Sequence, residues 1–199
     1  MAMPARNPTT PDLDGLWGML LKRGSERYDG EEVSHLDHAL QAATLARRAG
    51  ADDALVAAAL LHDIGHLLCG LPGTPSSIGV DDRHEDVGAN ALTAWLPPVS
   101  IASIRLHVQA KRWLACDKTY LNVLSRDSLR SLALQGGPMT PVEREQFTAT
   151  PHAASAIRLR RWDDGAKMST MVTDDLDTFW SVVERVAGEH RRTRAGSTG

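Results

Sequence analysis

The sequence lacks the features that mark secreted, disulfide-bonded or membrane proteins. Its two cysteines, Cys69 and Cys116, stand far apart and outside any CxxC pair, so neither a disulfide framework nor a zinc–thiolate site is expected. The longest apolar run, residues 54–61, is far shorter than the roughly 20 residues that span a bilayer. The first ten residues contain no apolar core of the kind that a secretory signal needs. We therefore expect a cytoplasmic protein with no membrane partner.

The chain also lacks a net positive charge. The chain has 22 Lys and Arg residues against 25 Asp and Glu residues, which gives a formal net charge of −3. Proteins that bind nucleic acid need a broad positive surface to neutralise phosphates, so we expect no nucleic-acid partner. One small basic cluster, Arg158, Arg160 and Arg161, could serve a small anion.

Alternating strand patterns are almost absent, whereas helix caps and helix stops recur from end to end. This punctuation predicts an all-α protein. The length of 199 residues is enough for one domain with a real core. We expect a single domain over residues 1–199, with an ordered core at about 10–190 and flexible tails.

The same punctuation predicts where the helices begin and end. In the first half we expect a helix opened by Thr10-Pro11 and closed by Gly24, one at about 36–49 stopped by Gly50, one capped by Asp52 or Asp53 that breaks near Gly65, and one from an Asp82–Glu85 capping box to Pro97. In the second half we expect helices at about 99–116, from Ser125 to Gly136, from a Thr140–Glu143 capping box, after Pro151, and along the stripe Leu176, Phe179, Trp180, Val183 and Val186. Segment 69–80 is a long loop that could act as a lid, and the tail beyond about His190 should fray.

Histidine and carboxylate side chains that could bind a metal are spread over these helices. They are His38, His62, Asp63, His84, His107 and Asp163. Imidazole and carboxylate ligands without thiolate suit iron, manganese or zinc, and helices in a bundle can direct such side chains at one centre. Taken singly, each histidine could equally be a capping, core or surface residue. Spacing alone does not prove that they meet.

The order His38…His62-Asp63…His84…His107…Asp163 resembles the HD-domain superfamily, whose minimal signature is H…HD…D. The resemblance covers roughly residues 28–167 and implies a helical bundle with a metal site between helices. It also implies a dinuclear site: His38, His62 and Asp163 on a first metal, His84 and His107 on a second, and Asp63 bridging them. Asp163 is preferred to Asp164 as the last ligand because the family's final Asp stands four residues before a Lys, as Asp163 stands to Lys167.

Three local segments resemble a narrower group, the PhnZ-type mixed-valent di-iron oxygenases. Tyr28-Asp29-Gly30-Glu31 resembles the family's substrate-sensing segment, in which Tyr28 would occupy a metal site until substrate arrives and Glu31 would meet a substrate amine. Lys111, one helical turn after His107, would bind phosphonate oxygens. The segments around Ser128 and Gln135 could donate hydrogen bonds to phosphonate, and Arg160 or Arg161 could clamp it.

This resemblance implies a function. We expect two iron ions, Fe(II) and Fe(III), with O2 as co-substrate, and oxidative cleavage of the carbon–phosphorus bond of a 1-hydroxy-2-aminoethylphosphonate, with or without N-methyl groups. The products would be phosphate and glycine or an N-methylated glycine. Asp63, His62 and Lys111 are the expected catalytic residues. The main alternative is an HD-type metal-dependent phosphohydrolase of a nucleotide or phosphomonoester. A polyol oxygenase like myo-inositol oxygenase and a non-catalytic metal-stabilised module are further alternatives.

Overall fold

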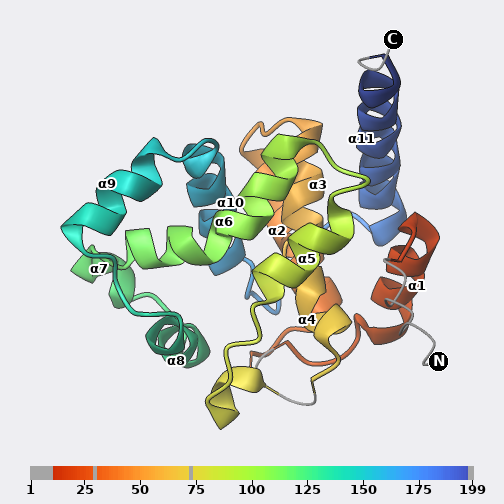
Figure 1. Cartoon of the computed structure of the whole chain (residues 1–199). Helices are drawn as coiled ribbons and strands as arrows, with labels where there is room; N and C mark the ends of the chain where they lie inside the picture. The colour runs from red at the N-terminus through yellow and green to blue at the C-terminus, as the bar shows by residue number, and fades with distance from the viewer. Residues whose placement is uncertain (1–10, 29–30, 72–73, 197–199) are drawn as a thin grey trace, which may run out of the picture.

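The computed structural model describes residues 11–28, 31–71 and 74–196, and these residues form helices without any named strand (Figure 1). The predicted helix opener Thr10 and the pair Asp29-Gly30 lie outside the described residues. In chain order, the helices are α1 Leu13–Arg23, α2 His35–Arg48, α3 Asp53–Leu61, α4 Ile64–Cys69, the 3₁₀ helix η1 Pro75–Ile78, α5 His84–Leu92, α6 Pro98–Leu114, α7 Lys118–Leu121, α8 Arg126–Leu134, α9 Pro141–Ala149, α10 Ala153–Gly165 and α11 Leu176–Gly196.

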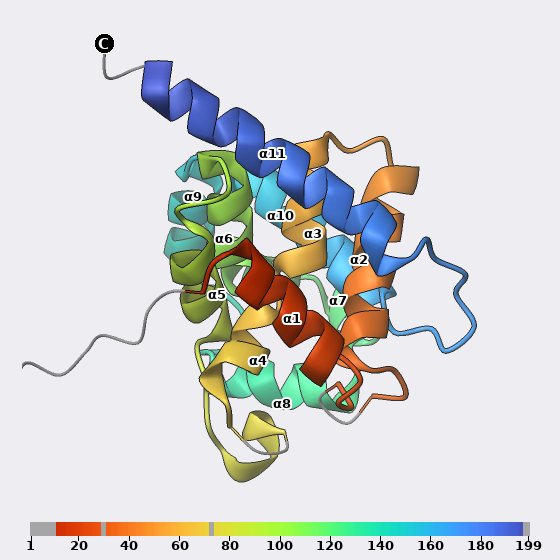
Figure 2. The same ribbon diagram turned by 90° about the vertical axis from the view of Figure 1, so that its right-hand side faces the viewer.

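Helices α2, α3, α6 and α10 form the centre of the molecule. Helix α3 packs against α2, α6, α10 and α11, and α10 packs along α6 and α2. Every residue of α3 from Leu55 to Leu61 is buried, because this Ala- and Leu-rich helix has no polar face to offer to solvent. Helix α11 crosses over α3 and α2 on one side (Figure 2), while α7, α8 and α9 lie at the opposite end (Figure 1). The all-α prediction is therefore confirmed.

Several predicted caps are present. Asp52 accepts a hydrogen bond from Leu55 N at 2.9 Å and starts α3. Ser125 caps α8, and a capping box of Thr140 and Glu143 starts α9. The cap of α1 differs from the predicted Thr10-Pro11 opening: it is Asp12, whose side chain accepts a hydrogen bond from Gly15 N. These short polar side chains satisfy backbone N–H groups that have no partner within the helix.

The predicted end of the last helix was wrong, and one short helix was missed. The final helix does not fray after His190 but continues to Gly196, because the last residues, Arg191 to Ala195, include strong helix formers. The short helix α7 was not predicted.

Among the described residues no helix combines the length and the apolar character that a membrane span requires.

The third helix breaks earlier than predicted, at His62-Asp63, and Gly65 lies inside α4. Gly65 serves close packing and not the break. A Cβ atom at this position would lie 1.9 Å from the carbonyl oxygen of His84 and 2.6 Å from its carbonyl carbon. The bare backbone of Gly65 therefore allows α4 and α5 to approach each other at the start of α5.

The segment after α4 partly covers the lower end of the bundle, where η1 lies against α8 (Figure 2). Ser76 in η1 donates a hydrogen bond to Asp127 in the first turn of α8. The predicted loop over 69–80 therefore contains a helical turn that is fastened to α8.

We expect Gly65→Ala to lower the free energy of unfolding by roughly 3 kcal/mol, because the new methyl group must push the α5 backbone away. Gly18→Ala in α1 is the matched control. A Cβ at Gly18 meets nothing within 4 Å, so this helical substitution should stabilise the protein by roughly 0.5–1 kcal/mol. Urea denaturation of both variants measures the difference, and equal stability of the two would contradict the packing role of Gly65.

Candidate metal centre

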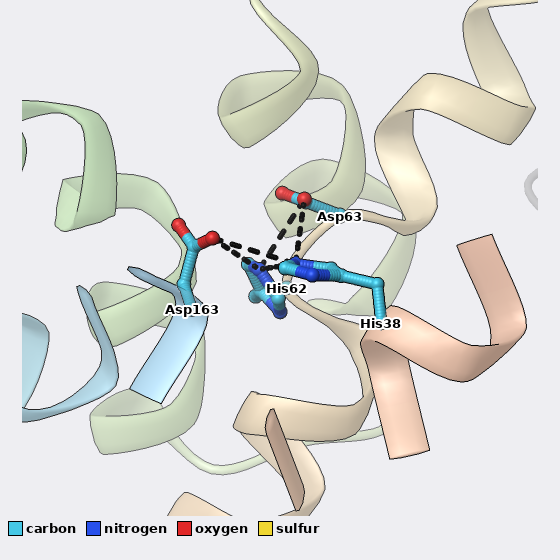
Figure 3. Close-up of side chains that lie close together, drawn as sticks. All are labelled: His38, His62, Asp63 and Asp163. Carbon is cyan, nitrogen blue, oxygen red and sulfur yellow. Dashed lines mark hydrogen bonds and ion pairs between the residues drawn. The ribbon is translucent and has the colours of Figure 1, made fainter. Parts of the chain in front are cut away.

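Four buried side chains from three parts of the chain meet between α2, α3 and α10 (Figure 3): His38, His62, Asp63 and Asp163. The Nε2 atoms of His38 and His62 lie 3.2 Å apart. Asp63 Oδ2 lies 3.5 Å from His38 Nε2 and 3.3 Å from His62 Nε2. Asp163 Oδ1 lies 3.4 Å and 3.8 Å from the same two nitrogens. We call these four residues the first group.

A second group consists of Asp63, His84 and His107. Asp63 Oδ1 lies 3.5 Å from the Nε2 atom of each histidine, and these two Nε2 atoms are 3.1 Å apart. Asp63 therefore has one carboxylate oxygen directed at each group. The structure brings together all six residues that the sequence suggested as metal ligands.

The helix ends place these side chains. His38 lies in the first turn of α2, whose start is fixed by a capping box of Ser34 and Asp37. In a continuous helix, adjacent residues point about 100° apart. His62 ends α3 and Asp63 precedes α4, so the change of helix lets both side chains enter one space.

Each histidine of the two groups has its Nδ1 atom bonded to an oxygen that can only accept. The acceptors are Ala166 O for His38 at 2.8 Å, Ala59 O for His62 at 2.8 Å, Asp82 Oδ1 for His84 at 2.9 Å and Ile104 O for His107 at 2.7 Å. The proton of the neutral ring must then sit on Nδ1. Each Nε2 atom therefore directs a lone pair at the centre, which is the arrangement of metal-binding histidines.

The lone pairs face one another, and only a proton or a cation between them relieves the repulsion. Burial opposes protonation of His62, but the carboxylates of Asp63 and Asp163 outweigh it and raise the pKa of His62 to about 10. Burial, together with the neighbouring His84, lowers the pKa of His107 well below its usual value. A divalent cation in the first group would replace the proton that the carboxylates attract to His62.

Two carboxylate oxygens at the centre have no hydrogen-bond donor among the described residues. They are Asp63 Oδ1 and Asp163 Oδ1, and both are buried. A buried anionic oxygen without a donor is costly, and a metal ion would supply the missing positive partner. Two ligand atoms that bind one metal at about 2.1 Å lie about 3 Å apart when they are at right angles. The spacings here are close to that value, so the residues fit a metal.

Asp82 supports the second group from outside. The predicted Asp82–Glu85 capping box is wrong: α5 begins at His84, and the preceding residue, Arg83, has a left-handed φ of 50° and makes no side-chain cap. Asp82 instead accepts from His84 Nδ1 at 2.9 Å and from His66 Nδ1 at 2.7 Å. Burial opposes ionisation, yet these two bonds lower the pKa of Asp82 well below its usual range. The His66 ring stacks on His84 with ring centres 3.8 Å apart.

Tyr28 covers the first group. Its ring is stacked on His38, with ring centres 4.0 Å apart, and its hydroxyl donates to Asp63 Oδ2 at 2.7 Å. The phenol is therefore hydrogen-bonded to the carboxylate that the two groups share. The role of Tyr28 as a temporary occupant of a metal site that substrate displaces stays a prediction.

A pocket opens beside both groups, and its wall combines cationic, hydroxyl and carboxylate side chains. The lining includes Lys111, Arg160, Lys167, Ser128, Ser131 and Gln135, together with five aspartates. Lys111 is only 3% exposed and donates to Ser131 Oγ at 2.9 Å. Its burial and the nearby Arg160 lower the pKa of Lys111 to about 7. No carboxylate lies within ion-pair distance of Lys111 among the described residues, so an anionic ligand would stabilise its charged form.

The structure separates the residues that the sequence left as alternatives. Arg160 is buried and binds Asp163 Oδ2 through Nη1 at 2.6 Å, whereas Arg161 is exposed and lines a different cavity together with Asp164. The expectation that Arg161 binds substrate is therefore not supported, because adjacent helical residues point in different directions. For the same reason Asp163 faces the histidines, and Asp164 faces Arg160 and Tyr120.

Lys167 is a pocket residue that the sequence analysis used only to choose Asp163. Its Nζ atom lies 3.2 Å from Glu31 Oε1, 3.1 Å from Ser128 Oγ and 3.4 Å from Ser125 Oγ. Glu31 is not among the described residues that line the pocket, and it reaches the pocket wall through this ion pair. One feature of the sequence could have identified Lys167 as a pocket residue: it lies just past the end of the helix that carries Asp163.

Comparison with known proteins identifies the family of this chain. The HD domain family matches residues 35–144, more than half of the chain. A "[1-hydroxy-2-(trimethylamino)ethyl]phosphonate dioxygenase (glycine-betaine-forming)" of Leisingera caerulea is 39% identical over 89% of this chain and 91% of its own. The chain belongs to the HD-domain family, and to its phosphonate dioxygenase branch.

Two further relatives differ in what is known of them. A "Hydroxymethylphosphonate dioxygenase" of Gimesia maris is 42% identical over 86% of each chain. An uncharacterized protein of Acanthamoeba polyphaga mimivirus is 32% identical over 78% of this chain and 73% of its own. The two named relatives act on phosphonates that differ in whether they carry a trimethylamino group. The family is therefore clear, while the side chain of the substrate varies within it.

We expect Asp82→Asn to weaken metal binding in the second group by about 10–100-fold, because His84 loses the anion that fixes its tautomer and orientation. The first group should retain its metal. Elemental analysis after dialysis against a graded chelator measures the metal per chain. Asp81→Asn, an exposed neighbour, is the matched control and should behave as the wild type. Equal loss of metal from both groups would contradict the role of Asp82.

Proposed function

We propose that this protein is a di-iron oxygenase that cleaves the carbon–phosphorus bond of a small 1-hydroxyalkylphosphonate. The observation that carries the proposal is the juxtaposition of two His and Asp groups, joined by Asp63, with a pocket that contains the buried Lys111. The names of the two phosphonate dioxygenase relatives support the reaction class.

The two groups provide for a pair of metals. His38, His62, Asp63 and Asp163 would hold one iron, and Asp63, His84 and His107 would hold the other. An iron pair would supply the activation of dioxygen, which no side chain of this site can perform. The second group offers three protein ligands, a number typical of catalytic sites that keep positions open for exogenous ligands.

The side chains of the pocket would bind and orient the substrate. Lys111 provides a buried positive charge for the phosphonate, and Ser128, Ser131 and the Gln135 amide provide hydrogen-bond donors beside it. Tyr28 would move from Asp63 when the substrate's hydroxyl and phosphonate reach the first group. A neutral polyol has no group that would use this positive charge, which favours a phosphonate over a polyol.

The overall reaction balances with dioxygen as the only oxidant. A 1-hydroxyalkylphosphonate and O2 give a carboxylic acid and inorganic phosphate. The carbon–phosphorus bond and the carbon–hydrogen bond at the same carbon break. Each of the two products gains one oxygen atom, so both atoms of O2 are accounted for. With an amino or trimethylamino group at the next carbon, the acid is glycine or an N-methylated glycine.

Oxygen dependence tests this proposal against phosphate ester hydrolysis, the alternative HD-domain reaction. We expect iron-loaded protein to release phosphate from a hydroxyphosphonate only when oxygen is present, with one O2 consumed for each phosphate. A phosphate assay and an oxygen electrode measure the two. Phosphate release from phosphomonoesters under anaerobic conditions would instead establish a phosphohydrolase.

Glu31 provides a test of the substrate's amine. We propose that the Glu31 carboxylate, held by Lys167, favours a cationic group on the substrate. Glu31→Gln should raise KM about 10-fold for 2-amino-1-hydroxyethylphosphonate, the usual scale for a lost charge-assisted contact of about 1.4 kcal/mol. It should leave the metal content unchanged and have little effect on hydroxymethylphosphonate.

Glu32→Gln is the matched control for this test. Glu32 is exposed, and its substitution removes the same charge from the neighbouring position. Both substitutions should be measured with hydroxymethylphosphonate, the 2-amino compound and its N-trimethyl derivative. Parallel changes for all three substrates, or a loss of iron together with the rise in KM, would contradict the assignment of Glu31 to the amine.

A further inference from the structure

A second cavity borders α10 at Arg161 and Asp164, and its lining also includes Lys118 and Tyr120 of α7. Neither Tyr120 nor Asp164 is among the described residues that line the substrate pocket, but Arg160 is. The side chain of Arg160 is 5% exposed. Its guanidinium therefore depends on protein groups for its hydrogen bonds.

The contacts of Arg160 form a connected chain. Nη1 binds Asp163 Oδ2 at 2.6 Å, Nη2 binds Asp164 Oδ1, and Nε donates to the hydroxyl of Tyr120 at 3.3 Å. The same hydroxyl donates to Asp164 Oδ2 at 2.6 Å. Tyr120 thus bonds to both Arg160 and Asp164, and it does so from α7, an element separate from α10.

We propose that Tyr120 and Asp164 are positioning residues for the first metal group, acting through Arg160. This inference rests on the proposed metal centre. Arg160 holds Asp163 by Oδ2 and thereby leaves Oδ1, the oxygen without a donor, directed at His38 and His62. A guanidinium is rigid only at its planar end, and the flexible chain behind it needs further contacts to hold one orientation. Tyr120 and Asp164 provide those contacts.

Charge supports the same assignment. One guanidinium lies between two carboxylates, with Nη1 on Asp163 and Nη2 on Asp164. Asp164 balances the positive charge on the outer side, so Arg160 is held from both sides and is not drawn wholly to Asp163. Without Asp164 or the Tyr120 hydroxyl, Arg160 could turn, and the orientation of the Asp163 carboxylate would be less well defined.

Release of zinc to a coloured chelator tests the proposal, because zinc occupies His and Asp sites without oxygen chemistry. Zinc-loaded protein with both groups filled should release metal in two phases. Tyr120→Phe should speed the phase of the first group by about 10-fold, at the lower end of the effect of removing an outer partner of a metal ligand. The phase of the second group should not change. Asp164→Asn, which breaks the same chain at another atom, should act in the same direction.

Lys118→Ala is the matched control, since Lys118 is exposed, lies on the same short helix and lines the same cavity. It should release zinc at the wild-type rates. Asp82→Asn provides the opposite pattern, with a faster second-group phase only, and identifies the two phases. The melting temperature of each metal-free variant reports on the fold separately.

The outcomes decide the proposal in either direction. Faster release from the first group alone, with an unchanged metal-free melting temperature, supports it. Wild-type release from Tyr120→Phe and Asp164→Asn overturns it, and so does equal acceleration of both phases, which indicates general loosening of the fold. The proposed function fails separately, when wild-type protein with iron does not consume oxygen with a hydroxyphosphonate.

Discussion

The structure depends on four imidazole nitrogens that point lone pairs into a buried space which also contains two carboxylates. Each ring is fixed by a bond from Nδ1 to an acceptor, so in its neutral form the Nε2 atom carries no proton. Pairs of such nitrogens at 3.1 Å and 3.2 Å repel one another, and Asp63 Oδ1 and Asp163 Oδ1 have no donor among the described residues. Positive charge between these atoms makes the arrangement favourable, and a metal ion held by the six residues would supply it.

The fold provides for this centre with backbone groups as well as side chains. Three of the four acceptors that fix the imidazoles are main-chain carbonyls, two of them in the same helix as the histidine they hold. Gly65 lets α4 approach the start of α5, where His84 lies. The helices that carry the ligands are thus also the helices that form the core, so a change in core packing moves the metal site.

Much of this could be predicted from the sequence, but not its geometry. The caps at Asp52, Ser125 and Thr140 follow local rules, and the structure contains them. The break at His62-Asp63 was placed too late because a glycine is a stronger local signal than a packing requirement, which depends on a helix that comes later in the chain. The role of Asp82 was misread for a similar reason: a capping box and a histidine partner use the same residue types, and only the neighbouring His66 and His84 decide between them.

Residue choice on α10 shows where a sequence pattern stops being informative. Arg160 and Arg161, like Asp163 and Asp164, are chemically identical neighbours, and only the direction of each side chain decides which one reaches the pocket. Once that direction is known, the rejected members of the two pairs acquire different roles. Asp164 balances the charge of Arg160, whereas Arg161 lies at the surface. The acidic pair thus serves one guanidinium from two sides, and it does so on a helix that carries three arginines.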